Sequence, residues 1–282
     1  MVFESFLNYK NYNHPFFIFI MGVFYSSFSV LFSYLFFQKE ASYFIVFFTA
    51  FMSFHFMYTT IKYEESYDLR LSTETKILKR HYNLIVLFLI LYIGFFVGFT
   101  VWNSVLPESE INKLFSEQQN SIHSVNQKII MGDFSSSNNF VKIFFHNIQV
   151  LVFVILFSFL FGAGAIFILS WNASVGGVFI GEIIRNNLLS FSAPASVIIG
   201  LVRYLPHAVF EFSGYFTAAL AGGIISVSLI KHDFMSDKFY KILYDVSSLL
   251  FISVLLIMFG AFVEVFITPF LFSSVINLFS YF

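Results

Sequence analysis

The chain has 282 residues, of which 58% are hydrophobic, 22% aromatic and only 11% charged. Soluble domains carry about 25% charged residues, so this chain has too few charges to cover a water-facing surface, and a soluble enzyme is excluded. The hydrophobicity excludes intrinsic disorder, and a net charge of −1 excludes a nucleic-acid binder. The absence of cysteine excludes disulfides, thiolate zinc sites and cysteine nucleophiles.

Long apolar runs predict several membrane crossings. About twenty apolar residues in a helix cross the roughly 30 Å of membrane hydrocarbon. Five runs reach this length, at 15–37, 41–61, 84–105, 148–171 and 247–270, the last interrupted by Glu264. A sixth stretch, 194–230, is too long for one span, so we expect a short helix up to Leu205, a break at Pro206 and a full span beyond it, because proline suits a first helical turn.

The segment 172–193 does not fit this pattern. Its apolar core, 173–184, is short and contains Glu182, and segments of this length are more often interfacial or re-entrant. We therefore predict an all-α, polytopic transmembrane helical bundle with about six full spans plus a broken or re-entrant helical region.

The distribution of lysine and arginine predicts the orientation in the membrane. The loop 62–83 carries five such residues and is expected to be cytoplasmic. The protein is then expected in the cell membrane with its N-terminus on the cytoplasmic side. The segment after Ile230 is also basic, and it lies on the same side only if the broken region crosses the membrane once. We divide the chain into an N-terminal hairpin and loop (1–83), a third span with an outer segment (84–146) and a core (147–282).

The outer segment, 108–130, is polar but has one apolar stripe at helical spacing. The stripe consists of Ile111, Leu114, Phe115, Ile122, Val125 and Ile129. It can pack on the rest of the protein, bind a protein partner or lie on the membrane surface. A homo-oligomer is a further possibility.

Ionisable residues at membrane depth are candidates for a site, because a charge at the centre of a spanning helix costs about 2.5–3.5 kcal/mol. They are Glu182, Arg185, Arg203, His207, Glu211 and Glu264. Glu182 with Arg185 and His207 with Glu211 have spacings that place each pair on one helix face. Arg203 needs a partner from elsewhere, for which Glu211 and Glu264 are candidates.

His207 and Glu211, four residues apart after Pro206, allow three interpretations. They can form a structural pair in a packed bundle, handle protons or ions, or share a metal. The sequence shows no third metal ligand. It also lacks a metalloprotease motif, a nucleophile elbow, a P-loop and a dinucleotide fingerprint, so we expect no enzyme and no cofactor.

Small residues predict close helix packing. They occur in two apolar stretches and would let helix backbones approach each other, with substrate passage as the alternative. The residues selected for a packing role are Gly162, Gly164, Asn172, Gly214, Gly222 and Gly223.

Three local patterns together resemble the stage II sporulation protein M family, in its archaeal type. The first is Asn147 followed by a span with Gly162-Ala163-Gly164. The second is 171–176, Trp-Asn-Ala-Ser-Val-Gly, and the third is 205–211, Leu-Pro-His-Ala-Val-Phe-Glu, before a small-residue span. The last span also resembles the family, since it runs from Glu264 to Thr268-Pro269. This chain departs from the family pattern at Ala208, where glycine is usual, and at His146-Asn147, where two asparagines are usual.

The resemblance implies a non-enzymatic integral membrane protein, since the bacterial namesake holds cell-wall hydrolases in a membrane complex. We therefore expect a scaffold or membrane-organising protein with Pro206, His207 and Glu211 at its centre. The alternative is a transporter or channel whose polar path runs through His207, Glu211 and Glu264. The third hypothesis is an intramembrane metal-dependent enzyme using His207 and Glu211.

Overall fold

The structure, a computed structural model, describes residues 15–68, 77–130, 136–161, 165–188, 191–231 and 237–280. Within these ranges every regular element is helical, which confirms the predicted all-α class. The α-helices are, in chain order, α2 (Pro15–Phe36), α3 (Ala41–Asp68), α4 (Ile77–Val105), α5 (Glu108–Leu114), α6 (Ser116–Ile130), α7 (Ser136–Phe161), α8 (Ile166–Asn187), α9 (Ala193–Lys231), α10 (Asp237–Phe262) and α11 (Thr268–Ser280).

Seven stretches of helix in the described residues are long and apolar enough to cross a membrane, which confirms a polytopic bundle. They lie in α2, α3, α4, α7, α8, α9 and the continuous α10–α11 segment. The predicted count of six spans plus a broken region differs from this because α8 is one full helix of 22 residues.

The predicted boundary between the fourth span and the broken region was wrong. The apolar run 148–171 is divided between two helices, since α7 ends at Phe161 and α8 begins at Ile166. The sequence between them is Gly162-Ala163-Gly164, and glycine is a poor helix former, which accounts for a helix end inside an uninterrupted apolar run. Run length alone does not reveal such an end, because no polar residue marks it.

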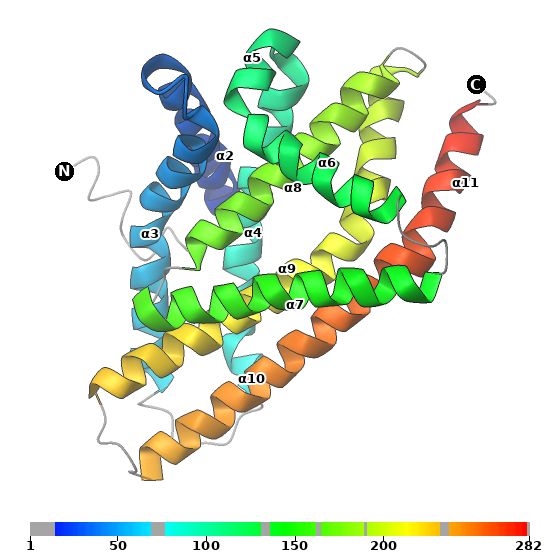
Figure 1. The fold of residues 1–282 in the computed structure, drawn as a ribbon. Coiled ribbons are helices and arrows are strands. Elements are labelled where there is room, and N and C mark those ends of the chain that lie inside the picture. Colours follow the sequence, from blue (N-terminus) through cyan, green and yellow to red (C-terminus); the bar gives the residue numbers. More distant parts are fainter. Residues whose placement is uncertain are drawn as a thin grey trace.

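The predicted break at Pro206 was also wrong, since α9 is a single helix of 39 residues with Pro206 inside it. Figure 1 shows that α9 changes direction along its length. Proline removes one backbone hydrogen bond and its ring crowds the preceding turn, so it bends a helix that neighbouring helices hold together.

The C-terminal apolar segment contains a π-helical turn, η2 (Val263–Ile267), between α10 and α11. Glu264 lies in this turn. π-turns inside α-helices are rare overall. Where they occur, they often lie at functional sites, because the wider turn redirects side chains.

α9 occupies the centre of the bundle and packs against α7, α8, α10 and α11. α4 packs between α2 and α8. In Figure 1 the second half of α9 runs beside α7 and α10, and α11 rises beside its first half. Gly22 and Gly94 let α2 and α4 touch, because a Cβ at Gly94 would lie 2.8 Å from the Cα of Gly22.

The helix count is compatible with both basic segments lying on one side of the membrane. Four helices that can span a membrane, α4, α7, α8 and α9, separate the segment after α3 from the segment after α9. An even number of crossings returns the chain to the same side. Figure 1 agrees with this parity, since α3 and α9 both end in the lower part of the view.

Candidate functional site

The candidate site is built on one face of α9. Arg203, His207, Glu211 and Tyr215 recur at every fourth position, so their side chains lie above one another along that face. We call these four residues the α9 polar stripe. His207, Glu211 and Tyr215 are buried, with exposed fractions of 7%, 9% and 2%. The stripe therefore points into the protein rather than toward lipid.

Asn147 on α7 supplies the partner for this stripe. Its side-chain amide Nδ2 donates a hydrogen bond of 2.5 Å to Oε1 of Glu211. Its carbonyl Oδ1 accepts a hydrogen bond of 3.1 Å from the hydroxyl of Tyr215. Asn147 is itself 6% exposed, so this three-residue network joins α7 to α9 in the interior. Buried polar groups in proteins nearly always have hydrogen-bond partners, because leaving one unpaired is costly.

His207 and Glu211 do not bond to each other. The Nδ1 atom of His207 is buried without a hydrogen-bond partner, while Oε1 of Glu211 bonds to Asn147. The aromatic neighbour of His207 is Tyr204, whose ring centroid is 5.3 Å away in an edge-to-face arrangement. The direct histidine–carboxylate pair considered from the sequence is therefore absent from this site.

Tyr204 is fixed against two neighbouring helices. Its ring stacks on Phe96 of α4 with the centroids 5.2 Å apart. On α8 it lies against Gly176, where a Cβ would be only 2.6 Å from the Cζ atom of Tyr204. Gly176 thus provides the space that places Tyr204 beside His207.

Glu264 and Arg203 complete the charged part of the site. Glu264, from the π-turn, lies within electrostatic range of Glu211, and Arg203 lies within range of both His207 and Glu264. The guanidinium of Arg203 also lies over the ring of Phe272 on α11, 5.7 Å from its centroid. Arg203 therefore links α9 to both parts of the C-terminal segment.

Gly260 allows α10 to approach this cluster closely. A Cβ at Gly260 would lie 2.6 Å from Cγ of Glu211, 3.3 Å from the Glu211 backbone nitrogen and 3.4 Å from the His207 carbonyl oxygen. The backbone of α10 is therefore in contact with the carboxylate-bearing turn of α9. A side chain at position 260 would displace Glu211.

Glu182 and Arg185 are not part of the α9 polar stripe or of its hydrogen-bond network. Glu182 on α8 accepts a hydrogen bond of 3.2 Å from the side-chain amide of Gln119 on α6. The Nε atom of Arg185 is buried without a hydrogen-bond partner. These two described residues form no ion pair with each other. The six residues selected from the sequence are thus divided between two places.

The residues selected for helix packing have different surroundings. A Cβ at Gly214 would lie 3.0 Å from the Ser253 carbonyl oxygen of α10, and one at Gly222 would lie 2.7 Å from Cβ of Ser158 on α7. Gly223 is buried, and Asn172 donates to the Ile168 carbonyl of its own helix. Gly162 and Gly164 lie outside the described residues.

The outer segment packs on the protein itself through its apolar stripe. The described members of that stripe, Ile111, Leu114, Phe115 and Ile122, are buried, and the side chains of Val125 and Ile129 lie outside the described set. Gln118 adds two polar contacts, since its amide donates to the Ser42 carbonyl and to the Ser174 hydroxyl, each at 3.2 Å. The described residues of α6 that are exposed, Asn120 and His123, are polar.

The geometry provides no metal centre among the described residues, because no three His, Asp or Glu side chains there come close enough to share an ion. Sequence reasoning missed Tyr215 and the role of Asn147 as the partner of Glu211. The four-residue spacing from Arg203 to Tyr215 was the available signal for Tyr215. Only the pairing of α7 with α9 brings Asn147 to the stripe.

Comparisons with known proteins agree with this architecture. The family model described as Stage II sporulation protein M matches residues 16–269, which includes the N-terminal helices as well as the core. An uncharacterised protein of Methanocaldococcus jannaschii is 34% identical over 136 residues, covering 46% of this chain and 71% of that protein. No solved structure matches. The chain is therefore a multi-pass membrane protein and belongs to the stage II sporulation protein M family.

Proposed function

We propose that the protein is a non-enzymatic scaffold or membrane-organising component. The observation that carries this proposal is the network of Asn147, Glu211 and Tyr215, which uses buried polar groups to join α7 to α9. The carboxyl oxygen of Glu211 thus accepts a hydrogen bond from a neighbouring helix. This is the arrangement of a rigid bundle, which can hold other proteins at fixed positions.

The close backbone contacts support the same proposal. Gly214 and Gly260 bring α9 and α10 together, and Gly222 brings α9 against α7. Association between helices in lipid depends on such van der Waals packing, because lipid tails provide no hydrophobic driving force. The core formed by α7, α9 and α10 is therefore closely packed as well as hydrogen-bonded.

Two surfaces are available to a partner. One is the exposed polar face of the outer segment, which includes Asn112, Lys113 and Asn120. The other is the exposed apolar face of α10, which includes Phe251 and Phe259. We place partner contacts on these faces, and we propose that the protein lies in the cell membrane with a cytoplasmic N-terminus.

Site-specific photo-crosslinking in native membranes tests the scaffold. A photoreactive residue would be introduced separately at Asn120 and at Phe251, with the buried positions Ile111 and Leu249 as matched controls on the same two segments. The scaffold predicts a discrete protein adduct from an exposed position and none from its buried control. Adducts to lipid alone at both exposed positions would contradict the proposal.

A second candidate function, ion or proton transport, is favoured by one observation. Glu264 lies in the π-turn within electrostatic range of Arg203 and Glu211, and the nearby Nδ1 of His207 lacks a partner. Ionisable groups inside a membrane often mark ion or proton routes. A flux measurement with reconstituted protein distinguishes this function from the scaffold.

A further inference from the structure

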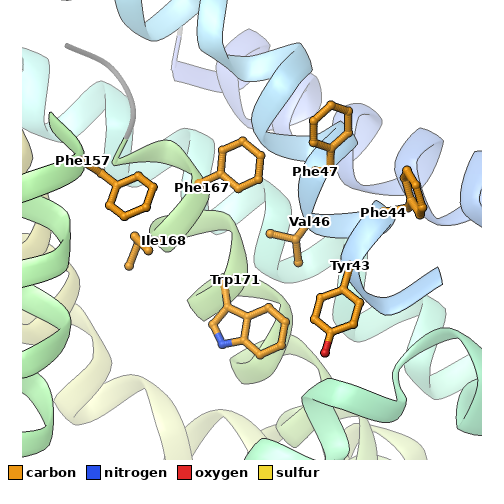
Figure 2. A pocket seen from close by; sticks show the side chains of 8 residues that line it. All are labelled: Tyr43, Phe44, Val46, Phe47, Phe157, Phe167, Ile168 and Trp171. Carbon is orange, nitrogen blue, oxygen red and sulfur yellow. The ribbon is translucent and has the colours of Figure 1, made fainter. Parts of the chain in front are cut away.

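A second feature of the molecule lies away from the polar stripe, in an apolar groove between α3, α7 and α8. The groove has a volume of about 460 Å³ and is lined by eight side chains, shown in Figure 2. All eight belong to stretches that can span a membrane, so the groove opens at membrane depth. The surrounding medium there is lipid.

Two aromatic pairs across α3 and α8 border the groove. Phe47 and Phe167 meet with ring centroids 5.9 Å apart, and Tyr43 and Trp171 stack with centroids 6.4 Å apart. Between these pairs the walls are aliphatic, formed by Val46 and Ile168 (Figure 2). The two pairs join α3 to α8 on either side of this aliphatic part.

The groove itself is lined almost wholly by apolar atoms, and polar atoms lie just beyond one end of it, which we call its polar end. Figure 2 shows the Tyr43 hydroxyl and the Trp171 indole nitrogen on one side, and Phe47, Phe157 and Phe167 on the other. Tyrosine and tryptophan occur at the membrane interface because their rings prefer lipid and their polar atoms prefer water. A ligand of this groove therefore has a long apolar part and a polar head.

Two acidic residues lie near this polar end. Glu117, in the first turn of α6, is held at the start of α3, because its backbone N–H donates a 3.3 Å hydrogen bond to the hydroxyl of Ser42, and Glu40 directly precedes α3. Aromatic faces beside carboxylates favour a cationic head, because an ammonium is attracted both to ring faces and to the acids. A head with only negative charge would be repelled there.

We propose that this groove is a lipid site, which holds one hydrocarbon chain of a bilayer lipid and directs an ammonium headgroup toward Tyr43, Trp171 and Glu117. The apolar end takes the chain, and the aromatic pair at the polar end sets how deeply the head enters. The volume lies in the range of sites that bind small molecules, which is about 300–1,000 Å³. The bound lipid would join α3 to α7 and α8.

Fluorescence quenching by brominated lipids tests the site directly. The sequence contains two tryptophans, so Trp102→Phe leaves Trp171 as the single reporter. Phosphatidylethanolamine with brominated chains would be titrated into the detergent-purified full chain. A site predicts quenching that saturates at a low mole fraction of lipid. Quenching proportional to mole fraction over the whole range would overturn the proposal.

A groove-filling variant makes the test specific. Ile168→Phe fills the groove and is expected to lower the lipid affinity measured by quenching by about tenfold or more. Every methylene that is kept out of an apolar site lowers the affinity several-fold. Ile93→Phe is the matched control, since Ile93 is lipid-exposed on α4 and does not line the groove. Equal affinity in these two variants would overturn the proposal. Val46→Leu is the second variant if Ile168→Phe does not fold.

Two further arms identify the occupant. Brominated phosphatidylglycerol is expected to bind with about tenfold lower affinity than brominated phosphatidylethanolamine, as measured by quenching. Equal affinity would overturn the ammonium assignment. Native mass spectrometry is expected to show the same subunit number for wild type and Ile168→Phe, with a retained lipid only in wild type. Loss of a dimer in the variant would show that a second copy, and not a lipid, fills the groove.

Discussion

The side-chain amide of Asn147 on α7 donates a 2.5 Å hydrogen bond to the carboxyl group of Glu211 on α9. Both residues are buried in a segment of the protein that lies within lipid, where no bulk water can replace the bond. Because Tyr215 donates to the same asparagine, both ends of the amide are used. This pair therefore fixes the position of α7 on α9.

Removing the amide of Asn147 is expected to destabilise the bundle. Asn147→Leu keeps the side-chain size but leaves Glu211 and Tyr215 without their partner, which should lower the free energy of unfolding by about 1–3 kcal/mol. Thermal unfolding in detergent measures the change. Asn172→Leu is the control, because Asn172 bonds only to its own helix, and it should cost less. Equal losses in both variants would contradict a tie between helices.

Glu211 can be tested with an isosteric change. In Glu211→Gln the side-chain carbonyl still accepts from Asn147, and no charge has to be buried, so stability should change by less than about 1 kcal/mol. Glu211→Ala leaves a cavity and an unpaired amide and should cost about 2–4 kcal/mol. Chemical unfolding of both variants gives the comparison. If alanine were tolerated as well as glutamine, the hydrogen bond would not hold the helices together.

Gly260 should be intolerant of even one added methyl group. Gly260→Ala places a Cβ 2.6 Å from Cγ of Glu211, and the resulting overpacking should cost about 1–3 kcal/mol. Gly200→Ala is the matched control, since its Cβ would come no nearer than 3.1 Å to the Ile180 side chain, with Ile184 at 3.6 Å and the Ile180 carbonyl oxygen at 3.7 Å. Combining Gly260→Ala with Asn147→Leu should be non-additive, because both changes act on Glu211. Strict additivity in unfolding measurements would argue against this coupling.

The seven membrane-spanning stretches predict which loops share a side. The chain lacks cysteine, so single cysteines introduced at Ser72, Ser236 and Gln38 report accessibility without background. Ser72→Cys and Ser236→Cys should react with an impermeant maleimide from one side of the membrane, and Gln38→Cys from the other. Labelling of Ser72→Cys and Ser236→Cys from opposite sides would show that an odd number of the helices α4, α7, α8 and α9 cross the membrane, which would contradict the four crossings.

The fold could be predicted from the sequence because run length and apolar composition follow directly from membrane thickness. The helix end after Phe161 could not be predicted, since it falls inside a continuous apolar run. The continuity of α9 through Pro206 also depends on packing, because neighbouring helices hold the bent segment in place. Both errors concern where a helix ends, which local composition specifies only weakly.

The site could be predicted in part. Ionisable residues at membrane depth were chosen because burying a charge there is costly. This criterion identified Arg203, His207, Glu211 and Glu264, which the structure brings together around α9. The same criterion selected Glu182 and Arg185, which lie elsewhere, because it contains no information on which helix faces which. The partner of Glu211 could not be found by spacing, since Asn147 precedes it by 64 residues. Contacts of that range depend on the packing of the whole bundle.

The central claim is that the buried polar cluster is a structural tie rather than an ion route. Proton and ion flux into liposomes that contain the purified protein tests this claim most directly, with Glu211→Gln as the matched variant. We predict that wild-type and Glu211→Gln liposomes leak no faster than protein-free liposomes. A flux above that level in wild type that Glu211→Gln abolishes would contradict the account and establish transport.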